Sequence, residues 1–141
     1  MNKLTRALSL LIMFACGLPK LSFGDDQLSS KTCRQHPQLS GQCYYLRGRL
    51  SFYNGTPSLR LWPVRTHRLL GVSEGRFALP DYQNIPPELV EKLGGFDNEM
   101  FADFLVCPFT DDKPGVMRLI CVESATNIVV RQRSGQEPLP K

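Results

Sequence analysis

The sequence predicts a small, mostly β domain: a five-stranded Greek-key barrel with one short helix between the third and fourth strands. Three observations predict it. Residues 43–72 alternate apolar and polar side chains about an Asn-Gly pair, residues 86–94 have the proline start and glycine end of a short helix, and residues 101–133 return to β-rich runs. Three strands, a helix and two strands is the order of an OB-fold. We therefore expect an OB-like barrel, with an N-terminal arm, within residues 25–133.

Residues 1–24 have the composition of an export signal. The segment starts with basic residues, an apolar run covers residues 7–18, and small residues end the segment where a signal peptidase needs them. The apolar run is shorter than the roughly 20 residues that a membrane-spanning helix needs. We expect a secreted or periplasmic protein cleaved near Gly24, with lipid attachment at Cys16 as the alternative.

Removal of this segment changes the charge balance. It takes away three basic residues and no acidic one, which lowers the formal net charge from +4 to +1. The remaining charge is uneven, because residues 31–76 contain eight basic residues and one acidic residue, whereas residues 77–123 are acidic. Such a split indicates either an anion-binding face or basic and acidic elements that pair within one folded chain.

Four cysteines remain after cleavage: Cys33, Cys43, Cys107 and Cys121. An even number without a CxxC spacing in an exported chain indicates structural disulfides, not a redox or zinc site. Four cysteines permit three connectivities. We favour Cys33–Cys43 and Cys107–Cys121 because each pair closes a short loop, the second worth ~3 kcal/mol in the chain-entropy model.

The first predicted hairpin covers residues 43–63. Asn54-Gly55 suits a two-residue type I′ turn, which needs φ > 0 at both central positions. This turn sets a register that puts Arg49 opposite Arg60, and two like charges across a strand pair repel unless an anion lies between them. The apolar face comprises Tyr44, Leu46, Leu50, Phe52, Leu59 and Leu61, and the opposite face comprises Tyr45, Arg47, Arg49, Ser51, Tyr53, Ser58, Arg60 and Trp62.

Local signals define the middle of the chain. Gly48 allows the first strand to bend, and Pro63 interrupts the second strand because proline cannot donate to a ladder. Residues 67–72 are predicted as the third strand. The helix at residues 86–94 begins with two prolines, carries a glutamate in its first turn and ends at Gly94.

The last part of the chain is predicted as a second hairpin with an extension. It comprises a strand at 101–110, a turn at 111–115, a strand at 116–123, a bulge at 124–127, a final run at 128–133 and a flexible tail at 134–141. Symmetric pairing about the turn places Cys107 opposite Cys121, in keeping with the favoured disulfide.

Three stretches carry a resemblance to a known family. The runs GRLSFYNGTPSLRLWPVRTHRLLGV, FLVCPFT and ICVESATNIVV resemble a family of small, uncharacterised secreted bacterial proteins. The resemblance covers most of the predicted mature chain. It implies an exported protein and brings no activity, cofactor or site residue with it.

The leading functional hypothesis is a non-catalytic binding module of the bacterial envelope or secretome. Rings and guanidinium groups on one sheet face would stack on and hydrogen-bond an anionic or saccharide ligand, such as an anionic polysaccharide, or an envelope protein. The predicted ligand-binding residues are Tyr45, Arg47, Arg49, Tyr53, Arg60 and Trp62. In the competing structural interpretation, the arginine stems cover the rings or pair with the acidic second half. We expect no cofactor and no metal.

Two alternative functions rank below the binding module. A protein-interaction or inhibitor module would use residues 80–87 or an exposed strand edge. A metal-dependent nuclease lacks acidic residues at 31–73, so its ligands would be Asp81, Asp97, Glu99 or Asp103, which have no recognisable spacing. His36 and His67 have no motif that ties them to a nucleophile or a carboxylate. An enzyme therefore ranks third.

Overall fold

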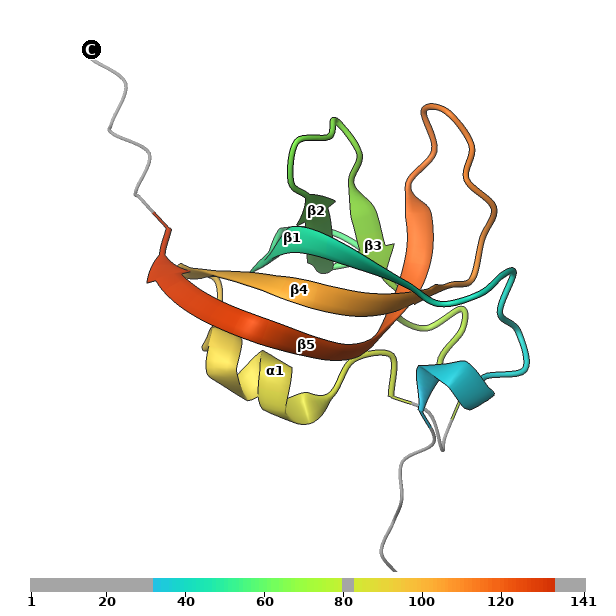
Figure 1. Cartoon of the computed structure of the whole chain (residues 1–141), viewed down its shortest axis with the longest axis horizontal. Helices are drawn as coiled ribbons and strands as arrows, with labels where there is room; N and C mark the ends of the chain where they lie inside the picture. The colour runs from blue at the N-terminus through green and yellow to red at the C-terminus, as the bar shows by residue number, and fades with distance from the viewer. Residues whose placement is uncertain (1–31, 80–82, 134–141) are drawn as a thin grey trace, which may run out of the picture.

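The structure is a computed structural model that describes residues 32–79 and 83–133. Its elements are η1 (Cys33–Gln35), β1 (Tyr44–Phe52), β2 (Leu59–Pro63), β3 (Leu70–Val72), α1 (Pro87–Leu93), β4 (Asn98–Pro108) and β5 (Arg118–Gln132), arranged as in Figure 1. The predicted signal with Cys16, the predicted tail at 134–141 and part of the predicted interaction loop lie outside the described residues.

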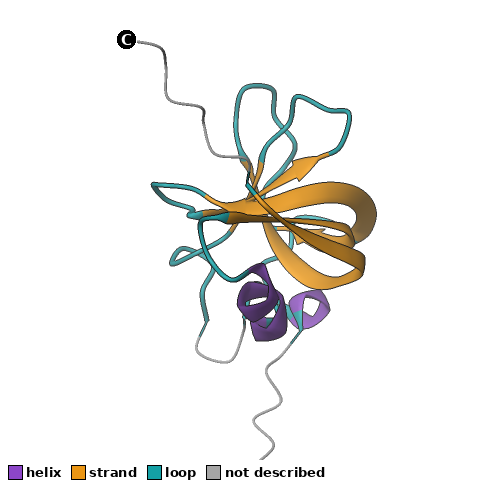
Figure 2. Cartoon of the chain, turned by 90° about the vertical axis from the view of Figure 1, so that its left-hand side faces the viewer, coloured by secondary structure: helices purple, strands orange, loops and turns teal. Residues whose placement is uncertain are grey.

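The five strands form one sheet that closes in a ring, in the order β1-β2-β3-β5-β4. β3 and β5 are parallel, and every other neighbouring pair is antiparallel. Figure 2 shows the curled sheet with both helices on the same side of it. The mostly β class and the predicted order of three strands, a helix and two strands are confirmed.

The register predicted for the β1–β2 hairpin is wrong by two residues. Arg49 lies opposite Trp62, and Arg60 lies opposite Ser51, so the two arginines do not face each other. The connection is a loop closed by a hydrogen bond of 2.7 Å from the backbone N–H of Tyr53 to the carbonyl oxygen of Ser58, not a two-residue turn. The loop contains Pro57, which has no N–H to donate, so the ladder resumes beyond it.

A shift of two residues leaves every side chain on its predicted face. Leu50, Leu59 and Leu61 are buried in the core, and Tyr44, Leu46 and Phe52 pack against it. The predicted apolar face of the hairpin is therefore confirmed. Gly48 lies where strands approach closely, because a Cβ there would be 2.7 Å from Leu61 Cδ1.

β3 is shorter than predicted, because it begins at Leu70 and residues 67–69 belong to the preceding loop. A tight corner precedes it: Arg65 has φ 64°, and the indole N–H of Trp62 donates to the carbonyl oxygen of Thr66 at 2.8 Å. These contacts hold the chain at the end of β2. β3 is therefore only three residues long, and it pairs with β2 on one side and with β5 on the other.

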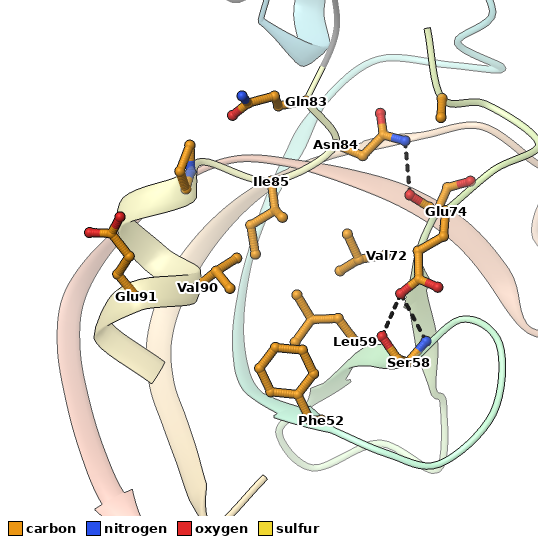
Figure 3. A pocket seen from close by; sticks show the side chains of 13 residues that line it. Phe52, Ser58, Leu59, Val72, Glu74, Gln83, Asn84, Ile85, Val90 and Glu91 are labelled. Atoms are coloured by element: carbon orange, nitrogen blue, oxygen red, sulfur yellow. Dashed lines mark hydrogen bonds between the residues drawn. The ribbon is translucent and has the colours of Figure 1, made fainter. Parts of the chain in front are cut away.

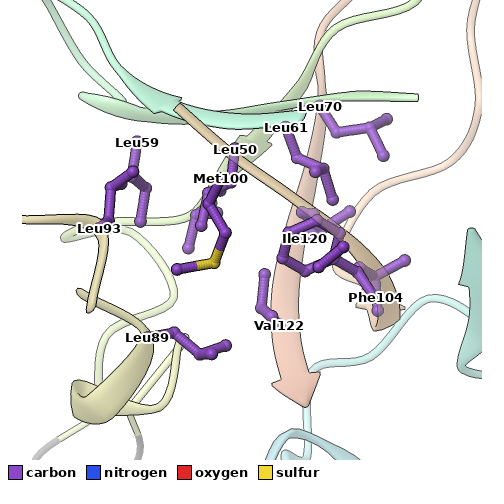
Figure 4. Packing of buried hydrophobic residues seen from close by; sticks show 13 residues of the cluster. Leu50, Leu59, Leu61, Leu70, Leu89, Leu93, Met100, Phe104, Ile120 and Val122 are labelled. Carbon is purple, nitrogen blue, oxygen red and sulfur yellow. The ribbon is translucent and has the colours of Figure 1, made fainter. Parts of the chain in front are cut away.

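α1 has the predicted signals at both ends. Two prolines precede and begin it, Glu88 lies in its first turn, and Gly94 ends it in the left-handed conformation with φ 72°. Leu89 and Leu93 are buried. The core cluster joins these two leucines to residues from all five strands, as seen in Figure 4, so α1 supplies one wall of the core.

The β4–β5 hairpin is also close to the prediction. Cys107 lies opposite Cys121, as predicted. The register shifts near residues 124–127, where a bulge was predicted, and Asn127 there has φ 51°. β5 continues through this irregularity to Gln132, so the predicted bend does not end the strand.

The favoured disulfide pairing is wrong. The bonds join Cys33 to Cys121 and Cys43 to Cys107. β1 runs antiparallel to β4 with Tyr44 opposite Val106, which brings Cys43 beside Cys107 at a Cα–Cα distance of 4.1 Å. The choice of short loops failed because the segment before β1 folds against the second hairpin. Two disulfides fit an oxidising compartment.

Candidate functional site

The predicted binding residues share one outer surface of the ring with residues from β4 and the end of β5. We call this surface the arginine face. Its residues are Tyr45, Arg47, Arg49, Tyr53, Arg60, Trp62, Glu99, Phe101, Asp103, Arg131 and Arg133. Five of these side chains are basic and two are acidic, so the face carries an excess of positive charge.

The strand registers align one row of side chains across the face. Trp62 pairs with Arg49, Arg49 with Phe101, and Phe101 with Val129. The guanidinium of Arg49 lies 5.1 Å from the centroid of the Trp62 ring, and that of Arg131 lies 5.5 Å from the Phe101 ring. Cationic groups thus lie over both rings of the row.

Carboxylates from β4 contact three of the arginines. Arg47 lies 3.3 Å from Asp103, Arg49 lies 3.2 Å from Glu99, and Arg133 lies 3.6 Å from the same carboxylate. In the structural interpretation, the arginines pair with the acidic second half of the chain. These three contacts agree with it, because the basic strand β1 lies beside the acidic strand β4. Five guanidinium groups carry far more N–H donors than two carboxylates accept, so the pairing is partial.

Arg60 is engaged with its own loop. Its Nε donates to the carbonyl oxygen of Pro57 at 2.9 Å, and a terminal nitrogen donates to that of Asn54 at 3.4 Å. Its guanidinium also lies 5.2 Å from the centroid of the Tyr53 ring. Because Arg60 faces Ser51 and not Arg49, the predicted repulsion between the two arginines is absent and no anion is needed between them.

Neighbouring side chains lower the pKa of Asp103, a carboxyl group of the arginine face. Asn127 Nδ2 donates to it at 2.7 Å, and this hydrogen bond, followed by the contacts with Arg47, lowers the pKa of Asp103 below its ordinary value. The asparagine is positioned by the bulge in β5, where it adopts φ 51°. The bulge therefore holds this carboxylate in its charged form beside Arg47.

The side chains of Phe101, Arg131 and Arg133 were missed as members of the face. Alternation in the final run, Ile-Val-Val-Arg-Gln-Arg, contained the signal, since Val129, Arg131 and Arg133 fall on one side. The sequence predicts a final run at 128–133 after the bulge but not its partner, and in the structure this run is the end of β5, paired with β4.

The outer side of β3 is covered by two loops. A Cβ at Gly71 would meet the side chain of Pro57 and lie 2.8 Å from Met117 Sδ. Arg68 forms an ion pair with Asp112, which joins the β2–β3 loop to the β4–β5 loop. The surface over β3 is therefore filled by the chain itself.

Two groups among the described residues that could serve metal binding or acid–base work, a cysteine pair and His36, are engaged in other contacts. Cys33 and Cys107 lie close to the carboxylate of Glu123, but both sulfurs are in disulfides and are not thiolates. His36 is buried, and its ring nitrogens contact the Phe77 carbonyl oxygen at 3.0 Å and the Gln38 N–H at 3.2 Å. The histidine expected to be a surface or hydrogen-bonded residue is hydrogen-bonded.

Comparison of the chain with protein-family models, with curated proteins and with solved structures found no match. Within residues 32–79 and 83–133, neither helix is long and apolar enough to cross a membrane. The arginine face must therefore be interpreted from its own geometry.

Proposed function

We propose that this protein is a non-catalytic, exported binding module that takes an anionic ligand, such as an acidic polysaccharide, on the arginine face. The observation that carries the proposal is the ratio of five arginines to two carboxylates on one sheet surface, with guanidinium groups over aromatic rings. Arginine presents planar N–H donors that match sulfate, phosphate and carboxylate groups.

Arg131 is the side chain on the face best placed for such a ligand. It is exposed, it lies over the Phe101 ring, and it contacts no carboxylate among the described residues. The ring restrains the guanidinium, so less side-chain freedom is lost when an anion binds. Its neighbour Arg133 lies over Tyr53 and contacts Glu99, which orients a second guanidinium on β5.

We also propose that the ring is an OB-like barrel. The strand order, the parallel β3–β5 pair and the helix between β3 and β4 support this assignment. OB-folds usually bind ligands on the strand 2–3 face between two loops. Here Pro57 and Met117 fill that surface over Gly71 of β3, which favours binding on the arginine face, formed by β2, β1, β4 and the end of β5.

Retention of the mature chain on immobilised heparin tests the function. We expect binding that weakens as salt rises, because screening acts on exposed charges. Arg131→Ala should weaken the affinity about three- to tenfold, as expected for the loss of one exposed charged contact. Heparin titrations at fixed ionic strength measure this change.

Arg34→Ala is the matched control, since Arg34 is an exposed arginine of the N-terminal segment, outside the face. It should leave heparin affinity within about twofold of the parent chain. Arg60→Ala should lower stability more than affinity, because Arg60 bonds to its own loop. Equal losses in Arg131→Ala and Arg34→Ala, or no salt-dependent retention at all, would contradict the proposed face.

Protein interaction is a second candidate, favoured by the edge of β5. β3 pairs with β5 only at Arg118–Ile120, and the backbone N–H of Val122 donates to the carbonyl oxygen of Asn84 at 2.8 Å, so within the described residues the part of that edge beyond Val122 has no strand neighbour. Such an edge can accept a strand from another protein. A partner retained at high salt would favour this candidate over the arginine face.

A further inference from the structure

A pocket of about 540 Å³ lies between α1 and the ends of β1, β2 and β3, shown in Figure 3. None of its lining residues belongs to the arginine face. Its walls are mainly apolar, and the apolar lining residues are Phe52, Leu59, Val72, Ala78, Ile85, Pro87 and Val90. A volume of this size and an apolar lining are typical of sites for small organic molecules.

Two carboxylates give the pocket a defined charge. Glu91 lies on the α1 side and Glu74 on the β3 side, and both are exposed. Glu74 is positioned by Ser58, whose backbone N–H donates to its Oε1 at 3.0 Å. Among the described residues, the lining contains no lysine, arginine or histidine, so its own ionisable side chains are all acidic.

The polar part of the lining is occupied by the chain itself. Asn84 Nδ2 donates to the carbonyl oxygen of Ser73 at 2.9 Å. Asn84 Oδ1 and Ser73 Oγ have no hydrogen-bond partner among the described residues, but both atoms are fully buried and neither is open to the pocket. The groups left to accept from a ligand's N–H donors are therefore the exposed carboxylates.

We propose that this pocket binds a small organic cation, a molecule with an apolar ring or chain and one protonated amine. The apolar part lies between Val90 of α1 and Val72 of β3, and the ammonium group lies at Glu74 on the β3 side, while Glu91 adds negative charge on the α1 side. The inference goes beyond the proposed function, because it concerns another site and a ligand of opposite charge. Failure of heparin binding would leave it intact.

The test uses the mature chain with two matched probes, 1-naphthylmethylamine and the anionic 1-naphthylacetate, followed by amide chemical shifts. The amine should shift the signals of Val72, Ile85 and Val90, and should bind at least about tenfold more tightly than the acid. In Glu74→Gln/Glu91→Gln, this preference should disappear while weak binding of both probes remains.

Two variants make the result specific. Glu88→Gln removes the same charge from α1 outside the pocket and should leave the preference unchanged. Val90→Trp fills the pocket and should abolish binding of both probes; if it does not fold, Ala78→Trp replaces it, since Ala78 is exposed at the rim. Equal affinity for the two probes, shifts spread over other surface carboxylates, or unchanged binding in the folded filled variant would overturn the proposal.

Discussion

Asp103 shows how a single residue of the arginine face depends on a backbone irregularity in another strand. Its pKa is lowered first by Asn127 and then by Arg47. A carboxyl whose pKa is lower in the folded chain stabilises the fold above its unfolded pKa, and this contribution is lost as pH falls through the folded pKa. Asn127 therefore helps to preserve the contact with Arg47 in mild acid.

Asn127→Gly should raise the pKa of Asp103 toward its ordinary value, since it removes the strongest cause of the shift. Glycine tolerates the φ of 51° at this position, so the backbone is kept. Carboxyl chemical shifts followed by NMR from neutral to acidic pH measure the change. Asn54→Gly, in the β1–β2 loop, serves as the control and should leave the titration of Asp103 unaltered.

For a single residue, the alternation of side chains along a strand predicts the face on which it lies, but not the residue that it pairs with. Side chains of β1 and β2 lie on their predicted faces because the period of a strand is two, and the error in register was also two. The predicted cross-strand partners in β1 and β2 are wrong because the prediction placed the turn from Asn54-Gly55 alone. The missing donor of Pro57 lengthens the loop, and this moved Arg60 away from Arg49.

Among the strands, β3 depends most on the loops around it. Gly71→Ala should destabilise the protein by about 1–3 kcal/mol, the usual cost of overpacking, because the new methyl group would meet Pro57 and Met117. Chemical denaturation gives the free energy of unfolding. Gly41→Ala is the matched control, since its Cβ would lie at an ordinary 3.6 Å from Pro108 Cγ.

Replacement of an unstrained glycine by alanine stabilises slightly through the unfolded state, so a loss in Gly41→Ala as large as that in Gly71→Ala would contradict crowding at Gly71 as the cause. Destabilisation of Gly71→Ala alone would support the tight cover over β3. The same cover is the reason for proposing a ligand on another side of the ring.

Elements with local signals were predicted well. α1 carries its start, its first-turn glutamate and its glycine stop within nine residues, and all three have the expected positions. β3 was overestimated because residues 67–69 are stretched along a loop fixed by distant contacts, including that of Arg68 with Asp112. The sequence of residues 67–69 alone does not predict a contact with a residue as distant as Asp112.

For the whole molecule, the two disulfides are long-range links. Cys33–Cys121 spans 88 residues and Cys43–Cys107 spans 64. In the chain-entropy model, a loop of either length is worth roughly 4–5 kcal/mol, more than the short loop expected from the sequence. Both bonds fasten the N-terminal segment to neighbouring positions of the β4–β5 hairpin.

Replacing both cysteines of either pair with serine should therefore lower the free energy of unfolding by about 2–5 kcal/mol. Urea denaturation of the two double variants, with the parent chain under oxidising conditions, measures this loss. Cys33→Ser/Cys43→Ser tests the connectivity, since it breaks both native bonds and should cost more than either pair. A smaller loss in that variant would contradict the connectivity.

Only some residues of the arginine face could be predicted from the sequence. Tyr45, Arg47, Arg49 and Trp62 were placed on one face by strand period alone. Closure of the ring brings Arg131 and Arg133 to the same surface, and pairing of β1 with β4 brings Glu99 and Asp103. Those pairings join residues far apart in the chain, and periodicity within one segment does not specify them.

The two disulfides are nested, and this arrangement affects the order in which they can form during synthesis. The inner bond joins Cys43 to Cys107 and the outer bond joins Cys33 to Cys121, so each needs a cysteine from the second hairpin. Synthesis runs from the N-terminus, so an unfinished chain that lacks Cys107 holds Cys33 and Cys43, together with Cys16 until the predicted signal is removed. Cys33 and Cys43 can form a disulfide with each other at that stage, and the finished protein does not contain this bond. Correct oxidation thus depends on late bond formation, or on thiol–disulfide exchange that undoes the early pair.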